Sequence, residues 1–195
     1  MEKNKLSADE ALAILKEGNE RFVKNELKHP NLDVARRQML REGQAPHTVV
    51  LTCADSRLVP DLIFDQGLGD LFTIRVAGNV AKEKVLGSIE YAVANLGTKL
   101  VIVLGHESCG AVTAALEPAE VEGHVGAILE ELKPAVFAAR QQQGDLLENA
   151  IKNNAIFMKE RIKDSMPVLN RAVRQEGVKV VSAYYSLGNG EVSWI

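Results

Sequence analysis

The chain of 195 residues has only two cysteines, Cys53 and Cys109, so it is not a small protein cross-linked by several disulfides. No apolar run approaches the roughly 18 residues of a membrane span, and no apolar leader opens the sequence. We therefore expect a cytoplasmic protein with no membrane partner. No block of lysine and arginine appears and the net charge is −3, which argues against a nucleic-acid partner.

Hydrophobic residues make up 46% of the chain, enough to bury one substantial core. This length and composition predict a single domain over residues 1–195. Within it, the sequence pattern separates an N-terminal helical arm, residues 1–43, from an α/β zinc-binding core, residues 44–195.

The arm contains two predicted helices. Ser7 and Glu10 have the spacing of a capping box, which predicts a helix that ends near Lys24. The second helix, from Val34 to Arg41, has few apolar residues and gains little from burial by itself. We expect this part of the arm to lean on a partner surface.

Short apolar runs alternate with helical patterns in the core. Runs without polar alternation are typical of strands covered on both faces, as in parallel sheets. The predicted strands are residues 48–52, 71–76, 100–104, 178–185 and 192–195, and the predicted helices are residues 82–95, from 111, 120–143, 145–163 and 167–176. Pro118 should interrupt one helix, and Pro134 should kink or divide another. The alternation predicts an α/β fold, with a mainly parallel β-sheet of about four to five strands, flanking helices and the N-terminal arm.

Both cysteines lie in polar clusters that follow predicted strands. Cys53 and Asp55 follow one strand, and His106 and Cys109 follow another. Because the carboxyl ends of parallel strands meet at one edge of a sheet, these groups can share an ion. Two thiolates and an imidazole suit Zn²⁺. Cys53, His106 and Cys109 therefore predict one zinc ion per chain, with Asp55 or water in the fourth position.

Arg57 competes with the metal for Asp55. An arginine can bind a carboxylate through two parallel hydrogen bonds and hold it off the ion. Asp55 is thus a conditional fourth ligand, and Asp55 and Arg57 are the predicted catalytic pair beside a zinc-bound hydroxide. Three alternatives stay open: an ordinary ion pair of these two residues, two inert buried cysteines, and a Cys53–Cys109 disulfide without metal.

The two clusters resemble the signature of the β-class carbonic anhydrases. They read Cys-Ala-Asp-Ser-Arg at 53–57 and His-Glu-Ser-Cys-Gly at 106–110, and residues 62–72, 75–79 and 88–93 resemble the segments between them. The resemblance is dense from about Gln44 to about Val112. It implies zinc-dependent reversible hydration of carbon dioxide to bicarbonate and a proton.

The resemblance also implies a substrate pocket and an assembly. Gln44, Phe72, Val76 and Tyr91 fall where family members surround the substrate, and we place Gly110 of the second motif with them. Core packing is the alternative for the apolar and aromatic members of this set. In the family the active site forms at a dimer interface, with N-terminal helices wrapped over the partner, so we expect a homodimer or a dimer of dimers here. Two other functions stay open: a zinc hydrolase of the same scaffold acting on carbonyl sulfide or carbon disulfide, and a non-catalytic zinc-binding module.

Overall fold

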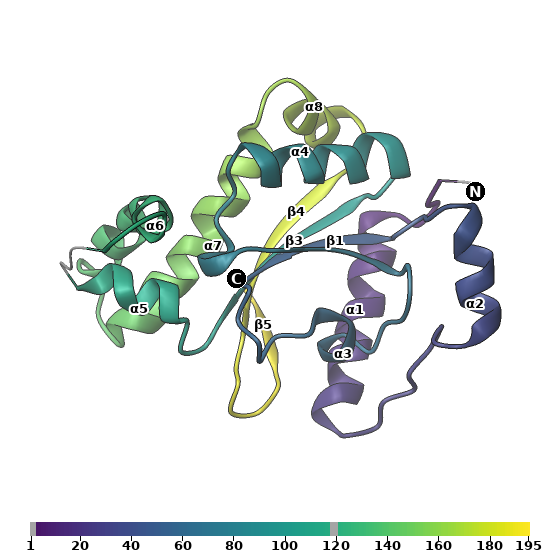
Figure 1. Ribbon diagram of the computed structural model, residues 1–195, viewed down its shortest axis with the longest axis horizontal. Helices are drawn as coiled ribbons and strands as arrows, with labels where there is room; N and C mark the ends of the chain where they lie inside the picture. The colour runs from purple at the N-terminus through teal and green to yellow at the C-terminus, as the bar shows by residue number, and fades with distance from the viewer. Residues whose placement is uncertain (1–2, 118–120) are drawn as a thin grey trace.

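One five-stranded sheet organises the computed structural model, which describes residues 3–117 and 121–195 (Figure 1). The strands are β1 (Thr48–Thr52), β2 (Leu71–Arg75), β3 (Leu100–His106), β4 (Lys179–Tyr185) and β5 (Val192–Trp194). Their spatial order is β2-β1-β3-β4-β5. The first four are parallel, and β5 pairs antiparallel with β4. The predicted fold class, a mainly parallel α/β sheet, is confirmed.

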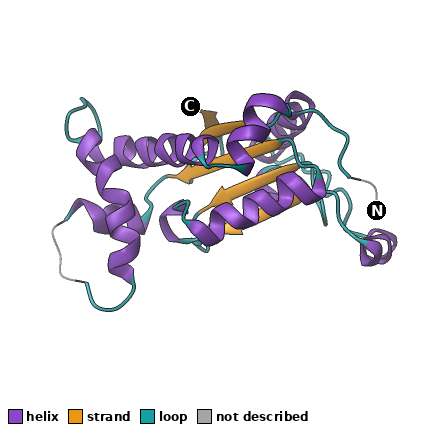
Figure 2. Ribbon diagram, turned by 90° about the horizontal axis from the view of Figure 1, so that it is seen from above, coloured by secondary structure: helices purple, strands orange, loops and turns teal. Residues whose placement is uncertain are grey.

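Helices cover both faces of this sheet (Figure 2). They are α1 (Ala8–Val23), α2 (Val34–Met39), α3 (Pro60–Ile63), α4 (Glu83–Tyr91), α5 (Gly110–Leu116), α6 (Val125–Ala139), α7 (Leu146–Asp164) and α8 (Val168–Gln175). Buried residues of α1 and α3 pack on one face, and those of α4 to α8 pack on the other. Because both faces are covered, β1 and β3 are buried along their whole length, as their unbroken apolar runs predicted. No helix in the two described ranges is both long enough and apolar enough to cross a membrane.

The strand order differs from the simplest interpretation of the sequence. The crossover through α4 joins β2 to β3, and these strands are parallel as predicted. They are not neighbours, because β1 lies between them and pairs with both. The pairing of β1 with β3 brings the loop after β1 next to the loop after β3.

Helix α6 departs from its predicted bounds. It runs unbroken from Val125 to Ala139 through Pro134, so the proline does not divide it. The apolar face of α6 is buried against α7, and this packing outweighs the hydrogen bond that Pro134 cannot donate. The predicted break at Pro118 and the predicted helix start at Glu120 lie outside the described residues.

Two buried carboxylates attach the arm to the core. Asp65 accepts hydrogen bonds from the Arg21 guanidinium (2.6 Å) and from the backbone N–H groups of Lys28 (3.1 Å) and His29 (2.9 Å). Asp70 accepts from donors on Arg36 (2.9 Å), Asn31 (2.8 Å) and the Gly67 backbone (2.9 Å). We call these two carboxylates and their donors the arm-docking network. The network holds α2 although that helix has no buried residue of its own.

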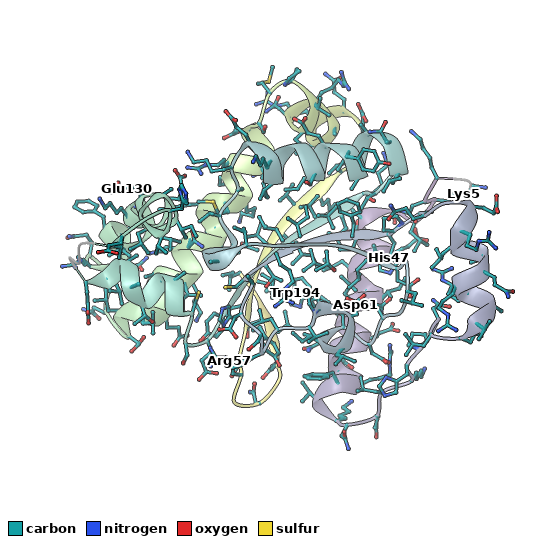
Figure 3. All side chains as sticks on the ribbon, viewed as in Figure 1. Lys5, His47, Arg57, Asp61, Glu130 and Trp194 are labelled. Carbon is teal, nitrogen blue, oxygen red and sulfur yellow. The ribbon has the colours of Figure 1, made fainter. Side chains whose placement is uncertain are left out.

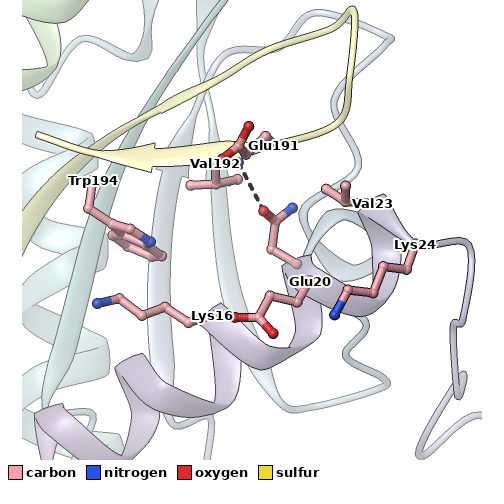
Figure 4. A pocket seen from close by; sticks show the side chains of 8 residues that line it. Lys16, Glu20, Val23, Lys24, Glu191, Val192 and Trp194 are labelled. Carbon is pink, nitrogen blue, oxygen red and sulfur yellow. Dashed lines mark hydrogen bonds between the residues drawn. The ribbon is translucent and has the colours of Figure 1, made fainter.

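Helix α1 closes the outer edge of β5. The Asn19 side chain accepts a hydrogen bond from the Val192 backbone N–H (2.9 Å, dashed in Figure 4) and donates to the carbonyls of Gly190 (2.9 Å) and Ile63 (3.1 Å). Beside it lies a hollow of about 340 Å³, in which the Lys16 ammonium sits 5.6 Å from the centre of the Trp194 ring. A buried amide thus takes the place of a neighbouring strand at this edge.

Candidate metal centre

The loops that follow β1 and β3 meet at one edge of the sheet. Thr52 and Leu104 are register partners near the ends of these two strands. The chain therefore delivers Cys53 on one loop and His106 and Cys109 on the other to the same place. One ligand atom from each of the three residues lies within 4.8 Å of the others, and all three residues are buried. The structure brings the three predicted zinc ligands together.

The His106 ring is oriented as a metal ligand. Its Nδ1 lies 2.8 Å from the Glu107 carbonyl oxygen, which can only accept, so Nδ1 carries the proton. Nε2 is buried and has no hydrogen-bond partner among the described residues. A buried nitrogen lone pair without a partner is costly. Nε2 fits a bound cation, and the hydrogen bond at Nδ1 fixes the tautomer that binding needs.

The two cysteines are thiols placed as a pair. Their sulfurs are 4.0 Å apart, about twice the ~2.05 Å of a disulfide bond, and both residues are free. The Cys109 thiol donates to Cys53, which lowers the pKa of Cys53, and the same bond together with burial raises the pKa of Cys109. A cation would allow both sulfurs to be thiolates at once, as zinc ligands are.

Asp55 and Arg57 form a two-pronged ion pair next to this cluster. Arg57 Nε lies 2.9 Å from one carboxylate oxygen of Asp55, and Nη2 lies 2.7 Å from the other. These bonds hold the pKa of Asp55 well below its usual range. Arg57 Nη2 also donates to the Ser108 carbonyl (3.2 Å), so one side chain links the two metal-site loops. Asp55 does not belong to the three-ligand cluster, because both of its oxygens face Arg57.

Two further groups support Cys53 and were not identified as site residues from the sequence. Arg75 donates to the backbone carbonyls of Cys53 (3.2 Å) and Asp55 (2.5 Å). The Gly78 backbone N–H points at the Cys53 sulfur, 3.4 Å away. Arg75 ends β2 and Gly78 follows soon after, so the rule that sites form at the carboxyl ends of parallel strands could have found both.

Val76 and Gly110 lie beside the cluster. The Val76 backbone N–H donates to the carbonyl of Thr52, the residue before Cys53 (3.1 Å). Gly110 follows Cys109, and a Cβ placed there would meet no atom within 4 Å. A cavity of about 460 Å³ includes Val76 in its lining, together with Val80, Lys82, Glu83, Lys84 and Val85, and none of the three cluster residues lines it.

Gln44, Phe72 and Tyr91 lie away from the cluster of their own chain. Phe72 is three residues before the end of β2, about 10 Å along the strand, and its ring packs 6.3 Å from that of Tyr91. Gln44 precedes β1, whereas Cys53 follows it. His47 and Arg57, labelled in Figure 3, mark these two opposite ends of β1. Within one chain, these three predicted substrate residues do not join the metal ligands.

Comparison with known proteins gives the same family at the level of sequence. The carbonic anhydrase family model matches residues 48–192. Carbonic anhydrase 2 of Mycobacterium tuberculosis (strain CDC 1551 / Oshkosh) is 50% identical over 131 residues, which cover 65% of this chain and 63% of that protein. A carbonic anhydrase of Mycolicibacterium smegmatis is 48% identical over 131 residues, covering 65% and 64%. The matched region is thus less than two thirds of the length of either relative.

Solved structures agree with this result. The β-carbonic anhydrase CcaA superposes with a TM-score of 0.73 and 25% identity over 94% of each chain. A tetrameric β-carbonic anhydrase of Sordaria macrospora has the same fold, with a TM-score of 0.76 and 24% identity over 82% of this chain and 85% of that one. The chain therefore belongs to the carbonic anhydrase family and has the fold of its β class, as the two sequence motifs predicted.

Proposed function

We propose that the protein catalyses the zinc-dependent, reversible hydration of carbon dioxide to bicarbonate and a proton. The observation that carries this proposal is the buried cluster of Cys53, His106 and Cys109 beside the Asp55–Arg57 ion pair. The donor set fits zinc, because it combines two sulfurs and a buried nitrogen that lacks a partner among the described residues. Zinc bound there would lower the pKa of a bound water and so make it a nucleophile, but two thiolates should leave that pKa above the value of about 7 known for a site of three histidines.

Asp55 orients the attacking water in this proposal. Arg57 keeps the carboxylate ionised, so Asp55 can accept a hydrogen bond but has no proton to donate. The two-pronged contact also fixes the direction of the carboxylate. A water that donates one hydrogen to Asp55 is held with a lone pair free for attack on carbon.

An apolar surface suits an uncharged linear substrate, because carbon dioxide has no charge to be desolvated. Val76 offers such a surface: with Val80 and Val85 it lines the apolar side of the 460 Å³ cavity, whose other lining residues are Lys82, Glu83 and Lys84. The open space at Gly110 lies next to the ligand Cys109. Val76 and Gly110 are therefore our candidates for substrate contacts from the same chain.

We infer a homodimer or a dimer of dimers in which the partner completes each pocket. Gln44, Phe72 and Tyr91 are at least partly exposed and cannot reach the metal cluster of their own chain. Several large apolar side chains are exposed on the arm, around α3 and at the end of α4: Val34, Met39, Val59, Leu62, Leu68 and Tyr91. A neighbouring chain would bury them. Sedimentation of the native protein should show no monomer, and a fully active monomer would contradict the inference.

The other functions considered are less well supported by the site. A non-catalytic zinc module would need Asp55 as a permanent fourth ligand, but Arg57 engages both of its oxygens. No contact of the described residues favours carbonyl sulfide or carbon disulfide over carbon dioxide. The paired free thiols suit a reducing compartment, which supports the cytoplasm as the place of this activity.

Stopped-flow measurement of carbon dioxide hydration, together with metal analysis, tests the proposal. The purified protein should contain one zinc per chain and hydrate carbon dioxide. Cys53→Ala should lose both the zinc and the rate, because a ligand is gone. Asp55→Asn should keep the zinc but lose about 10²-fold in rate, the low end of the range for positioned proton acceptors.

The matched control is Asp9→Asn, which removes a carboxylate from a surface ion pair with Lys179 and should change neither quantity. Absence of any zinc-dependent rate above that of buffer would contradict the proposed function. A higher rate with carbonyl sulfide than with carbon dioxide would favour the alternative hydrolase.

A further inference from the structure

Glu107 lies between the zinc ligand His106 and Ser108, and its backbone is held on both sides. Its carbonyl accepts the hydrogen bond from His106 Nδ1 (2.8 Å). Its N–H donates to the Tyr185 carbonyl (2.8 Å), which extends the pairing of β3 with β4 by one residue. The main chain of Glu107 is therefore hydrogen-bonded both to β4 and to the His106 ring.

The Glu107 side chain makes a separate attachment to the turn between β4 and β5. One carboxylate oxygen accepts from the Ser186 hydroxyl (2.9 Å) and from the Gly188 backbone N–H (3.1 Å). The turn is itself anchored. Its Gly190 N–H donates to the Ser186 carbonyl (3.0 Å). The Asn19 side chain of α1 donates to the Gly190 carbonyl and accepts from the Val192 N–H. The carboxylate is thus tied to a fixed platform.

Ser108 explains why such an anchor matters. Its φ of 53° is in the left-handed region, which is unfavourable for residues other than glycine and persists only when surrounding contacts hold it. The carbonyl that orients His106 belongs to the peptide bond between Glu107 and Ser108. If Ser108 relaxed to an ordinary backbone angle, that peptide would turn and its oxygen would leave Nδ1.

We propose that Glu107 is a positioning residue for the metal site: its carboxylate, bound to the β4–β5 turn, holds the 107–108 peptide so that His106 Nε2 faces the ion. The inference rests on the proposed zinc site. It adds a connection from α1 through the β4–β5 turn to a metal ligand, made by a residue that touches neither metal nor substrate.

Zinc affinity of the full-length protein, measured by competition with a chromophoric chelator, tests this role without any assay of turnover. Glu107→Ala should weaken zinc binding about tenfold, the low end of the effect seen when partners of metal ligands are removed. Glu107→Gln should stay within about threefold of the wild type, because its amide oxygen can still accept from Ser186 and Gly188. Glu191→Ala is the matched control and should leave zinc affinity unchanged. It removes another carboxylate of the same turn, one that accepts only from Asn189 among the described residues.

Co²⁺ substitution supplies a second readout. The visible spectrum of the Co²⁺ form should change in Glu107→Ala and not in the control, because a displaced imidazole alters the ligand geometry. Ser108→Gly removes the strain at that position, so in its background the effect of Glu107→Ala should shrink. If Glu107→Ala does not fold, Ser186→Ala replaces it and should weaken zinc binding about threefold.

Equal zinc affinity and equal Co²⁺ spectra in the wild type and in Glu107→Ala would overturn the inference. So would an equal loss in Glu107→Gln and Glu107→Ala, because charge rather than hydrogen bonding would then be the cause. A wild-type protein that binds no zinc would instead contradict the proposed function.

Discussion

Two buried polar regions lie at opposite ends of β1, and they differ in how completely their groups are paired. In the arm-docking network, Asp65 and Asp70 each accept from three donors. In the metal cluster, His106 Nε2 has no partner among the described residues, and the two cysteine sulfurs have only a 4.0 Å contact with each other and a 3.4 Å contact from the Gly78 N–H. Buried polar groups are normally satisfied in folded proteins. The paired region therefore stabilises the fold, whereas the unpaired one fits the metal ion that we propose.

The other buried polar atoms that lack a hydrogen bond also lie near the metal cluster. Within residues 3–117 and 121–195, the only further buried side-chain nitrogen or oxygen atoms without a hydrogen-bond partner are Asn79 Nδ2 and Asn154 Oδ1. Asn154 donates to the Gly78 carbonyl (2.8 Å), and the Gly78 N–H points at the Cys53 sulfur. The unmet hydrogen-bonding capacity of the described core is thus concentrated around the metal cluster.

Removal of zinc should have the largest effect on stability of the changes considered. At a free zinc concentration of about 1,000 times Kd, the ion should stabilise the fold by about 4 kcal/mol. Chelation should therefore lower Tm by roughly 10 °C for a chain of this size. Calorimetry with and without chelator measures the shift. Cys53→Ala should show no zinc-dependent shift in Tm. A wild-type Tm that is the same with and without zinc would contradict a metal site at the unpaired region.

Asp65→Asn should give the next largest effect, at the paired region. Asp65 is buried, and the neutral amide leaves the Arg21 guanidinium without its counter-charge, which should cost about 3 kcal/mol. Asparagine tolerates the positive φ of this position, so the backbone is not strained, but its NH2 group would face a donor because both oxygens of Asp65 accept hydrogen bonds. Urea unfolding measures the loss. Zinc content should stay at one per chain, and an unchanged urea midpoint would show that the network does not stabilise the fold.

Asn19→Ala should destabilise the β5 edge. It leaves the Val192 N–H and the carbonyls of Gly190 and Ile63 without their partner, at a cost of about 2 kcal/mol. The more exposed Asn149 is the control, and Asn149→Ala should change stability by less than about 0.5 kcal/mol. Equal urea midpoints for the two variants would contradict the role of Asn19.

His47 should make the smallest contribution to stability, and this contribution depends on pH. Burial lowers its pKa from the ordinary 6.5, although its hydrogen bond with Gln66 opposes the shift. The unfolded chain then binds a proton more readily than the folded one, so this contribution to stability is complete above pH 6.5 and is lost as pH falls through the folded pKa. The slope cannot exceed about 1.4 kcal/mol per pH unit. Urea unfolding between pH 7 and 5 should be flatter for His47→Gln than for the wild type, and identical slopes would contradict this.

Local patterns in the sequence predicted much of the fold. The β1 strand has the predicted bounds, Thr48–Thr52, because a run of β-branched and apolar residues marks a buried strand. The capping box at Ser7 and Glu10 is present, with both of its hydrogen bonds. The proposed metal-binding role of Cys53, His106 and Cys109 rests on their types and on their places after strands, and the structure brings the three together.

Only the tertiary structure decided how these pieces meet. It placed β1 between β2 and β3, turned Asp55 toward Arg57, and tied Glu107 to a turn eighty residues away. It also set Phe72 and Tyr91 apart from Cys53, His106 and Cys109 of their own chain. Periodicity and propensity report only on the nearest residues along the chain. Strand order and side-chain pairing depend instead on which distant surfaces bury each other and which polar groups find partners there, and those are properties of the folded molecule as a whole.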